Sequence, residues 1–319
     1  MRKFLALAAK LAISLGLLYF ALARVNLGSL AARLQQIEIV WLLAAFALLG
    51  LQAYVIALRW REIVLRCGAS LSVARAFRFI LIGGFFNQTL PSTVGGDAAR
   101  IWLLGREGAG WAKATYSVLI DRLVGVLMLA VMVVLCLYWS FDLIRNPIGR
   151  AALLVIGLGC IFASAVFVAL GYRRWPILER LWLTRHLSEA TQSAHRIFAS
   201  SGIALRLALL ALAVHALTVV TAWLAAKSVA VPFGLMHALL LLPPVMLIAS
   251  VPISIAGWGV RESAMVLAFS YAGLPPSDGL LLSVLYGGLL FVFGAFGGLV
   301  WLAGSDRVST GQLVPKKRV

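Results

Sequence analysis

Three pairs of charged residues stand inside otherwise apolar stretches of the sequence. They are Asp97 with Arg100, Asp121 with Arg122, and Arg261 with Glu262. A charge in the hydrocarbon region of a bilayer is costly, so such residues indicate function by default. Asp97 and Arg100 are three residues apart, which places them on one helix face, where they could form an ion pair or present Arg100 to a phosphate. Asp121 and Arg122 are adjacent and point apart, so each needs another partner.

Arginine is the residue type that suits phosphate, because its planar guanidinium offers a fork of donors. Arg100 and Arg261 are the two arginines that we consider for this role. The alternative is that all these charges only hold helices together, and the sequence leaves both readings open. Near Arg100, Asn87 could cap freed backbone or bind a headgroup, and Gly95-Gly96 predicts a close approach of backbones. The full set of expected substrate-binding residues is Asn87, Pro91, Gly95, Gly96, Asp97, Arg100, Asp121, Arg122, Pro252, Gly257, Gly259, Arg261 and Glu262.

The composition explains where these charges must lie. The chain has 319 residues, of which 62% are hydrophobic and 12% charged, with a mean hydropathy of +1.00. A soluble domain carries about 25% charged residues, so a soluble enzyme, a nucleic-acid-binding domain and a disordered scaffold are all excluded. The net charge of +17 therefore indicates basic loops facing anionic lipid headgroups rather than a nucleic-acid partner. We expect an all-α polytopic membrane protein.

Apolar stretches of about 20 residues predict the membrane-spanning helices. Six qualify, and two further regions, Ala76–Leu104 and Leu235–Tyr271, are too long for one helix and are interrupted. Gly83-Gly84, Asn87, Pro91 and Gly95-Gly96 interrupt the first; Pro243-Pro244, Pro252, Gly257 and Gly259 interrupt the second. We interpret both as re-entrant or broken helical segments, because unwound backbone at membrane depth needs protein or a water-filled cavity around it. The six spans are Phe4–Ala23, Ile39–Leu58, Tyr116–Trp139, Ala151–Gly171, Ile203–Ala225 and Leu280–Gly304.

The distribution of basic residues predicts the orientation. With a cytoplasmic N-terminus, 20 of the 28 Lys and Arg residues fall inside and 6 outside, while Lys10 and Arg122 lie within spans. The positive-inside rule then places both termini in the cytoplasm. Residues 173–202 form the one long polar stretch, which we expect to be an amphipathic cytoplasmic linker whose arginines could also bind headgroups. The stretch that ends at Ala23 also resembles a signal peptide, so cleavage there is the alternative to a first span.

An internal repeat relates the two interrupted segments. Pro91, Gly96 and Arg100 match Pro252, Gly257 and Arg261 at one constant offset, which is close to half of the chain length. Under the predicted topology the two segments enter from opposite sides, which is the arrangement of transporters built from inverted repeats. We therefore expect a single domain over 1–319. It divides into a first half at 1–172, the linker at 173–202, a second half at 203–304 and a basic cytoplasmic tail at 305–319.

Two motifs carry a resemblance to a known family. They are NQTLPSTVGGDAAR from Asn87 to Arg100 and DRLVG from Asp121 to Gly125, and the resemblance extends to Pro252–Glu262. Across essentially the whole chain, the sequence resembles the lysylphosphatidylglycerol synthase transmembrane-region family of flippase-like membrane proteins. The resemblance implies a bacterial inner-membrane protein that handles lipid.

Members of this family differ in the lipid that they handle. In the multiple peptide resistance factors this domain moves aminoacylated phosphatidylglycerol and is fused to a soluble synthase domain. This sequence departs from that pattern, because it contains no synthase domain, and we do not expect it to be an enzyme. Other members of the family have been associated with hopanoid or polyprenol-linked glycolipid pathways. The resemblance therefore implies a lipid ligand without naming it.

Two functions from different classes are consistent with these features. In the first, the protein moves a phosphate-bearing glycolipid, an aminoacyl-phospholipid or a hopanoid-type lipid between leaflets, with Arg100 and Arg261 holding the phosphate in turn. In the second, it is a non-transporting accessory subunit that positions a lipid-modifying enzyme as its partner. A membrane transferase using Asp97 or Asp121 as base is a weaker third reading, because the sequence contains no catalytic or nucleotide-binding motif. We expect no cofactor and no metal, and we interpret His215 and His237 as packing residues.

Overall fold

The computed structural model describes residues 37–90, 94–143, 146–173, 182–251 and 257–304. Within these ranges the chain forms ten α-helices and one short π-helical turn, and no strand. In chain order they are α3 (Ile39–Arg66), α4 (Val73–Thr89), α5 (Gly95–Leu104), η1 (Gly105–Ala109), α6 (Trp111–Leu143), α7 (Pro147–Leu170), α8 (Trp182–Phe198), α9 (Ser201–Ser228), α10 (Leu235–Ala249), α11 (Val260–Tyr271) and α12 (Pro276–Ala303). The predicted all-α membrane architecture is confirmed.

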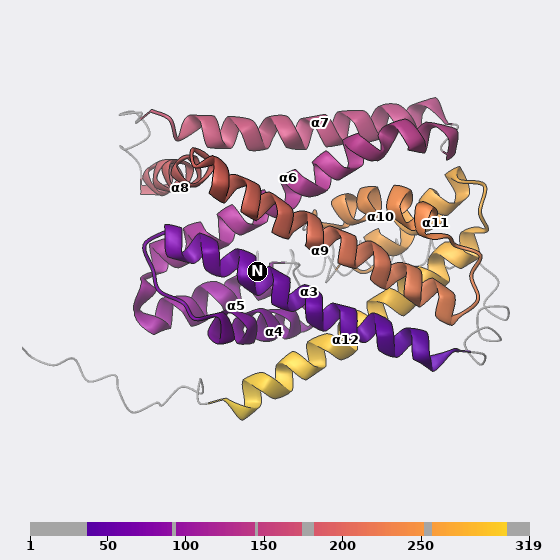
Figure 1. Cartoon of the computed structure of the whole chain (residues 1–319), viewed down its shortest axis with the longest axis horizontal. Coiled ribbons are helices and arrows are strands. Elements are labelled where there is room, and N and C mark those ends of the chain that lie inside the picture. Colours follow the sequence, from indigo (N-terminus) through magenta and orange to yellow (C-terminus); the bar gives the residue numbers. More distant parts are fainter. Residues whose placement is uncertain (1–36, 91–93, 144–145, 174–181, 252–256, 305–319) are drawn as a thin grey trace, which may run out of the picture.

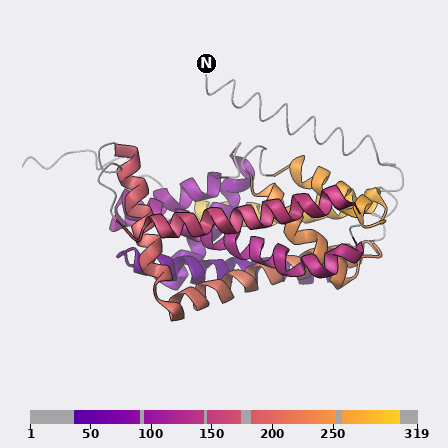
Figure 2. The same cartoon turned by 90° about the horizontal axis from the view of Figure 1, so that it is seen from above.

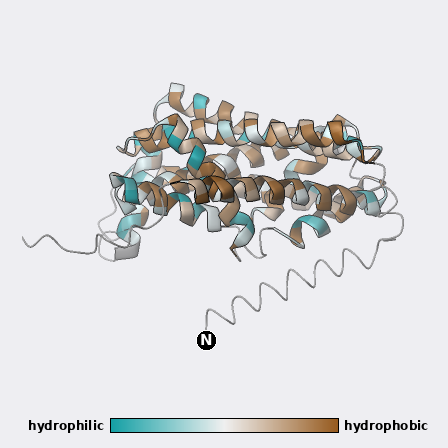
Figure 3. Cartoon of the chain, turned by 90° about the horizontal axis from the view of Figure 1, so that it is seen from below, coloured by the Kyte–Doolittle hydropathy of each residue, from teal (hydrophilic) through white to brown (hydrophobic). Residues whose placement is uncertain are grey.

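Five of these helices are long and apolar enough to cross a membrane, namely α3, α6, α7, α9 and α12. They coincide with five of the six predicted spans, and the sixth, Phe4–Ala23, lies outside the described residues. In Figure 1 the long helices run roughly along the long axis of the molecule, and apolar residues dominate them in Figure 3. The α7 helix follows the upper edge of the bundle in Figure 1 and crosses the middle of the view from above in Figure 2.

Both interrupted segments consist of two short helices. Their breaks are shorter than the sequence suggested, because α4 continues through Gly83-Gly84 and Asn87, and α10 continues through Pro243-Pro244. Helix-breaking residues are tolerated at membrane depth where neighbouring groups satisfy the backbone. The expectation that they interrupt the helices was therefore wrong at these positions. Pro91 and Pro252, predicted at the breaks themselves, lie outside the described residues, as does the tail at 305–319.

The helices repeat at the offset that the sequence indicated. The shift that carries Arg100 onto Arg261 also carries α3 onto α9, α4 onto α10, α5 onto α11 and α6 onto α12, with ends that agree within six residues. The α4–α5 hairpin lies in the left half of Figure 1 and the α10–α11 hairpin in the right half. The two halves also run in opposite directions, as α3 and α9 demonstrate.

The antiparallel packing of α3 and α9 follows from three contacts along their length. The backbone N–H of Glu38, which precedes α3, donates to Ser228 at the end of α9 at 2.9 Å. Near the middle, Gln52 donates to Thr218 at 2.8 Å. At the far end of α3, Glu62 pairs with Arg206 near the start of α9 at 3.4 Å. The contacts therefore support an inverted repeat.

The predicted linker at 173–202 contains a helix, α8, which packs against α7 and α6. Four of its buried residues, Ala190, Thr191, Ala194 and Ile197, recur at helical spacing. Ala194 and Ile197 join Ile63 of α3 and Ile120 of α6 in one apolar cluster. The amphipathic helix is thus present, and its position on the cytoplasmic side stays a prediction.

Candidate functional site

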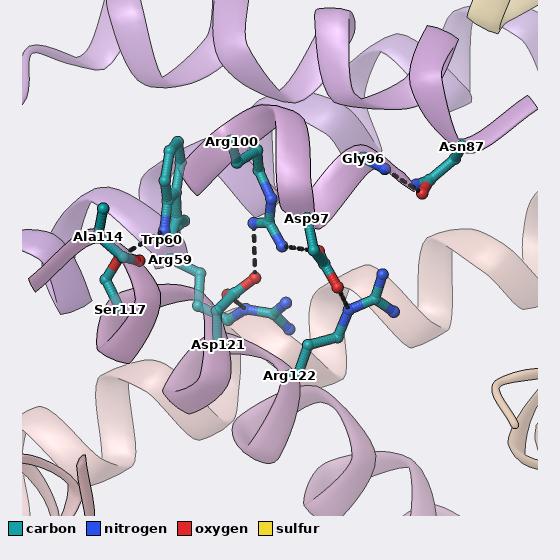
Figure 4. Close-up of polar contacts among 10 residues, drawn as sticks. All are labelled: Arg59, Trp60, Asn87, Gly96, Asp97, Arg100, Ala114, Ser117, Asp121 and Arg122. Atoms are coloured by element: carbon teal, nitrogen blue, oxygen red, sulfur yellow. Dashed lines mark hydrogen bonds and ion pairs between the residues drawn. The ribbon is translucent and has the colours of Figure 1, made fainter. Parts of the chain in front are cut away.

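Five charged side chains from three helices form a continuous chain of ion pairs (Figure 4). Arg59 of α3 donates from Nε to Oδ1 of Asp121 at 2.8 Å. Arg100 of α5 donates to Oδ2 of Asp121 at 2.9 Å and to Oδ1 of Asp97 at 2.6 Å. Arg122 of α6 completes the chain by donating from Nε to Oδ2 of Asp97 at 2.6 Å. We call these five residues the arginine–aspartate chain.

The arginine–aspartate chain confirms two predictions about charged residues. Asp97 and Arg100 do pair across one helix face, and Asp121 and Arg122 point apart to different partners. Four of the five side chains are at most 8% exposed, whereas that of Arg122 is 46% exposed. The arginine–aspartate chain therefore leads from the interior of the helix bundle to its surface.

Arg59 is the site residue that sequence reasoning missed. The predicted span ends at Leu58, which places Arg59 among the loop charges, but α3 continues to Arg66 and buries Arg59. The available signal was the need of Asp121 for a cation other than its neighbour. Trp60, the next residue, is also part of the site. Its ring lies 5.0 Å from the Arg100 guanidinium carbon, and its Nε1 donates to Ser117 at 3.2 Å.

The α4–α5 hairpin is narrow at the point where it positions Arg100. The side-chain Oδ1 of Asn87 accepts the backbone N–H of Gly96 at 2.7 Å, so Asn87 caps α5, as one of the two predicted roles required. A Cβ on Gly95 would lie 2.5 Å from the Phe86 carbonyl oxygen, and one on Gly96 would collide with that of Gly83. Gly95 and Gly96 are thus required for the close approach of α4 and α5.

The arginine–aspartate chain lines a cavity of about 430 Å³ at the centre of the bundle. One wall is formed by both ends of the first hairpin break, including Asn87 and Gly96, and another by Ala249 and Ser250 at the end of α10. The cavity therefore lies between the tips of the two hairpins. Its remaining polar lining is Gln52, Gln88 and His215, and the Nε2 atom of His215 lies 2.9 Å from the Gly125 carbonyl oxygen.

The second hairpin holds its charged pair elsewhere. Arg261 and Glu262 are buried, pair at 2.8 Å and do not line the cavity. Ser283 of α12 accepts from Arg261 at 3.1 Å and donates to Glu262 at 2.9 Å. Gly257 and Gly259 adopt positive φ angles of 81° and 85°, and the backbone N–H of Gly259 donates to Glu262 at 2.6 Å. The structure thus separates the predicted site residues into two groups.

The sequence places this architecture in a family. The model of the lysylphosphatidylglycerol synthase TM region matches residues 7–298, more than nine tenths of the chain. The chain belongs to this family. Comparisons with curated proteins and with solved structures each give no match. Membership of the lysylphosphatidylglycerol synthase TM-region family makes this a lipid-related, multi-pass membrane protein.

No group of three potential metal ligands occurs within the ranges that the structure describes. His237 caps its own helix, because its Nδ1 accepts the backbone N–H of Gly234 at 3.3 Å. His215 contacts a backbone carbonyl, as described above. The contact of His237 agrees with the interpretation from the sequence, whereas His215 also lines the cavity.

Proposed function

We propose that this protein binds the phosphate-bearing headgroup of a lipid in the central cavity and moves the lipid between leaflets. The cavity between the two hairpin tips, with three arginines in its wall, is the observation that carries the proposal. Arginine guanidinium groups bind phosphate through charge-assisted hydrogen bonds. In transporters built from inverted repeats, broken helices likewise meet at the substrate site.

The arrangement of the charges gives each arginine a role. Arg122, the most exposed member of the chain, meets the headgroup first, and Arg100 holds it deeper in the cavity. The proposal assigns no bond-making step to Asp97 or Asp121, whose oxygens all accept hydrogen bonds from arginines. A glycolipid, an aminoacyl-phospholipid and a hopanoid-type lipid are the candidate classes, and a lipid-modifying enzyme is the expected partner.

Lipid movement in proteoliposomes tests the proposal with variants of Arg100. We expect Arg100→Ala to reduce the rate by roughly tenfold to a hundredfold, because a charge-assisted contact of about 1.5–3 kcal/mol is lost. Arg100→Lys should lose less, since it keeps the charge without the fork. The control is Arg75→Ala, which removes a surface cation whose side chain is 64% exposed and pairs with Glu107. This control should move lipid at the normal rate.

The double variant Asp97→Ala with Arg100→Ala separates binding from scaffolding. In that variant Asp121 keeps Arg59, and Arg122 reaches the surface, so no charge is left buried without a partner. If Arg100 only stabilised the helices, the double variant would recover most of the lipid movement. We expect no recovery. Wild-type protein that moves no lipid at all would favour the accessory-subunit function instead.

The proposal includes a bacterial inner-membrane location with both termini in the cytoplasm, motivated by the basic-residue distribution. Single cysteines introduced at exposed positions of α8, for example Leu187, test it by thiol labelling in intact cells. We expect labelling only after the membrane is permeabilised. Labelling from outside would overturn the orientation.

A further inference from the structure

The arginine–aspartate chain carries one positive charge that no carboxylate in it balances. It contains three arginines and two aspartates, and no further carboxylate occurs among the described residues that line the cavity. Protonation of His215 would only add to the positive charge. The four buried members balance one another, so the excess charge belongs to Arg122, whose half-exposed side chain lines the cavity and is accessible to a bound anion. The cavity is therefore completed electrostatically by an anion.

The position of the missing acceptor is marked by Arg59. Its Nη1 atom is buried and has no hydrogen-bond partner within the described ranges, although Arg59 is only 6% exposed. Neither aspartate accepts from this atom, because their four oxygens accept from Nε of Arg59, from Arg100 and from Arg122 instead. In Figure 4 the terminal nitrogens of Arg59 point away from Asp121, toward the side of Arg122. An acceptor oxygen of a ligand between these two arginines would satisfy the group.

The neutral part of the lining indicates the chemistry next to the anionic group. Gln52, Asn87, Gln88 and Ser250 provide amides and a hydroxyl, and Phe293 is the one phenyl ring among the described lining residues. Amides and hydroxyls match the hydroxyl groups of glycerol or a sugar. A quaternary or primary ammonium is usually held by carboxylates or by several aromatic faces. In the described part of this wall the two carboxylates, those of Asp97 and Asp121, are already paired with arginines, and only one aromatic ring is present.

We propose that the cavity selects a lipid whose headgroup carries one net negative charge. Its chemical class is a phosphodiester joined to an uncharged, hydroxyl-bearing group, and a phosphodiester oxygen accepts from Arg59. Headgroups with an ammonium group, including aminoacylated ones, are disfavoured because they add positive charge to a positive cavity. This inference rests on the proposed function for the lipid nature of the ligand, and it concerns selectivity of binding rather than movement.

Competition binding to the solubilised full-length protein tests the selectivity. The probe is a fluorescent phosphatidylglycerol, and the competitors have matched acyl chains. They are phosphatidylglycerol with one negative charge, zwitterionic phosphatidylethanolamine, cationic lysyl-phosphatidylglycerol and phosphatidic acid, a phosphomonoester of higher charge. We expect phosphatidylglycerol to compete about tenfold better than phosphatidylethanolamine or lysyl-phosphatidylglycerol, the factor that one charge-assisted contact provides. Equal or better competition by lysyl-phosphatidylglycerol would overturn the inference.

Variants of Arg59 and Asp97 change the charge of the cavity in opposite directions. Arg59→Gln makes the chain neutral while Asp121 keeps Arg100, so the preference for phosphatidylglycerol should fall about tenfold. Asp97→Asn raises the net charge by one and should shift the preference toward phosphatidic acid. The matched control, Arg75→Gln, removes one surface charge and should leave the preference unchanged. A folded Arg59→Gln protein with the normal preference would contradict the role of Arg59.

Two further arms complete the test. If Arg59→Gln fails to fold, Arg59→Lys and Asp97→Asn decide the matter: the first should keep the preference for phosphatidylglycerol and the second should shift it. A soluble glycerophosphodiester without acyl chains tests whether the ligand is a lipid, and we expect it to compete at least tenfold more weakly. Equal competition would make a free phosphodiester the ligand. Selective binding without lipid movement would refute translocation alone, whereas movement without charge preference would refute this inference alone.

Discussion

Arg100 and Arg261 occupy corresponding positions of the two hairpins, and their surroundings differ in charge and in access. Each guanidinium carbon lies 5.0 Å from the centre of a tryptophan ring, that of Trp60 or Trp258. Arg100 belongs to a chain with one excess positive charge beside a cavity. Arg261 instead pairs with the carboxylate of Glu262, which is completely buried.

The difference indicates that one scaffold was used for two purposes. In both hairpins an arginine stands on the returning helix, in the middle of α5 for Arg100 and at the start of α11 for Arg261. Around the first hairpin the positive charges outnumber the negative charges by one, an excess that could serve a bound anion. In the second they balance, and Ser283 closes the group off against α12. The second cluster therefore connects α11 and α12, and neither Arg261 nor Glu262 is among the described residues that line the cavity.

The largest expected effect comes from Asp121, because it neutralises two buried arginines at once. Asp121→Ala removes the carboxylate that pairs with Arg59 and leaves Arg100 with Asp97 alone, and breaking buried pairs in this way costs about 3–5 kcal/mol. We expect a large loss of stability in thermal unfolding of the solubilised protein. The control is Glu107→Ala, which breaks a surface pair with Arg75 and should cost about 0–1 kcal/mol. Similar stability of the two variants would contradict the role of Asp121 as the counter-charge of two buried arginines.

Deleting the second pair as a unit should be far milder than deleting half of it. Glu262→Ala leaves Arg261 buried without its carboxylate and should lower the free energy of unfolding by about 3–5 kcal/mol. Arg261→Met combined with Glu262→Gln should regain most of that stability. The glutamine introduced in the double variant still offers an acceptor to the backbone of Gly259. Lipid movement by the double variant should remain near normal. Complete loss of movement in a stable double variant would return Arg261 to the binding site, as the sequence alone suggests.

The two corresponding glycines of the hairpins should respond to alanine for different reasons. At Gly96 a Cβ meets the backbone of Gly83, so Gly96→Ala should cost about 1–3 kcal/mol by overpacking. At Gly257 space is available, with the nearest atom 3.9 Å away, but the φ angle of 81° penalises any Cβ by about 1–2 kcal/mol.

Asparagine separates these two causes, because it tolerates positive φ but not a steric collision. Gly257→Asn should therefore be better tolerated than Gly257→Val, while Gly96→Asn should be no better than Gly96→Ala. The control is Gly84→Ala, where a Cβ would meet nothing within 4 Å and helix propensity should improve. Thermal unfolding of all five variants provides the comparison, and a destabilising Gly84→Ala would contradict it.

The smallest effect is expected at Asn87, which caps the first hairpin. Asn87→Ala removes the acceptor for the Gly96 N–H and should cost about 1 kcal/mol, the usual worth of a helix cap. Asn87→Asp retains an acceptor and should lose less stability. The corresponding residue of the second hairpin is Ile248, whose side chain has no acceptor, so Ile248→Ala tests packing alone. An Asn87→Ala effect above that of Asp121→Ala would reverse the assigned ranking.

The sequence predicts the long helices well, because hydropathy summed over about 20 residues is barely altered by any single residue. It predicts their ends poorly, as α3 illustrates. Arg59 is assigned to a loop because a count of basic residues does not distinguish a buried ion pair from a solvated charge. The buried positions Ala45, Leu49, Ala53 and Ala57 recur at intervals of four. Trp60, three residues after Ala57, continues the same helix face, and this spacing was a second sign that the helix continues.

The candidate site was predictable in its parts but not in its connections. The charge pairs, the Asn87 cap and the close approach at Gly96 follow from residue type and spacing. Which aspartate meets which arginine depends on how α3, α5 and α6 cross, and spacing along the chain contains no such information. Pro243-Pro244 exemplify the opposite error. These prolines predict a break in the helix, but α10 continues through them because its surroundings tolerate the unpaired backbone groups.

The glycines of α12 determine which helices can move together. A Cβ added at Gly294, Gly297 or Gly298 would lie within 3.2 Å of an atom of Gly84, Leu81 or Phe85, so these glycines let α12 and α4 pack at backbone distance. Leu247 of α10 packs in a corresponding way against Leu129 and Val133 of α6. The helices thus form two packed units, α4 with α12 and α10 with α6, and each combines a hairpin helix from one half of the sequence with a long helix from the other. The ion pairs between α5 and α6 connect these two units. A headgroup that competes for the arginines would therefore weaken the connection between the units.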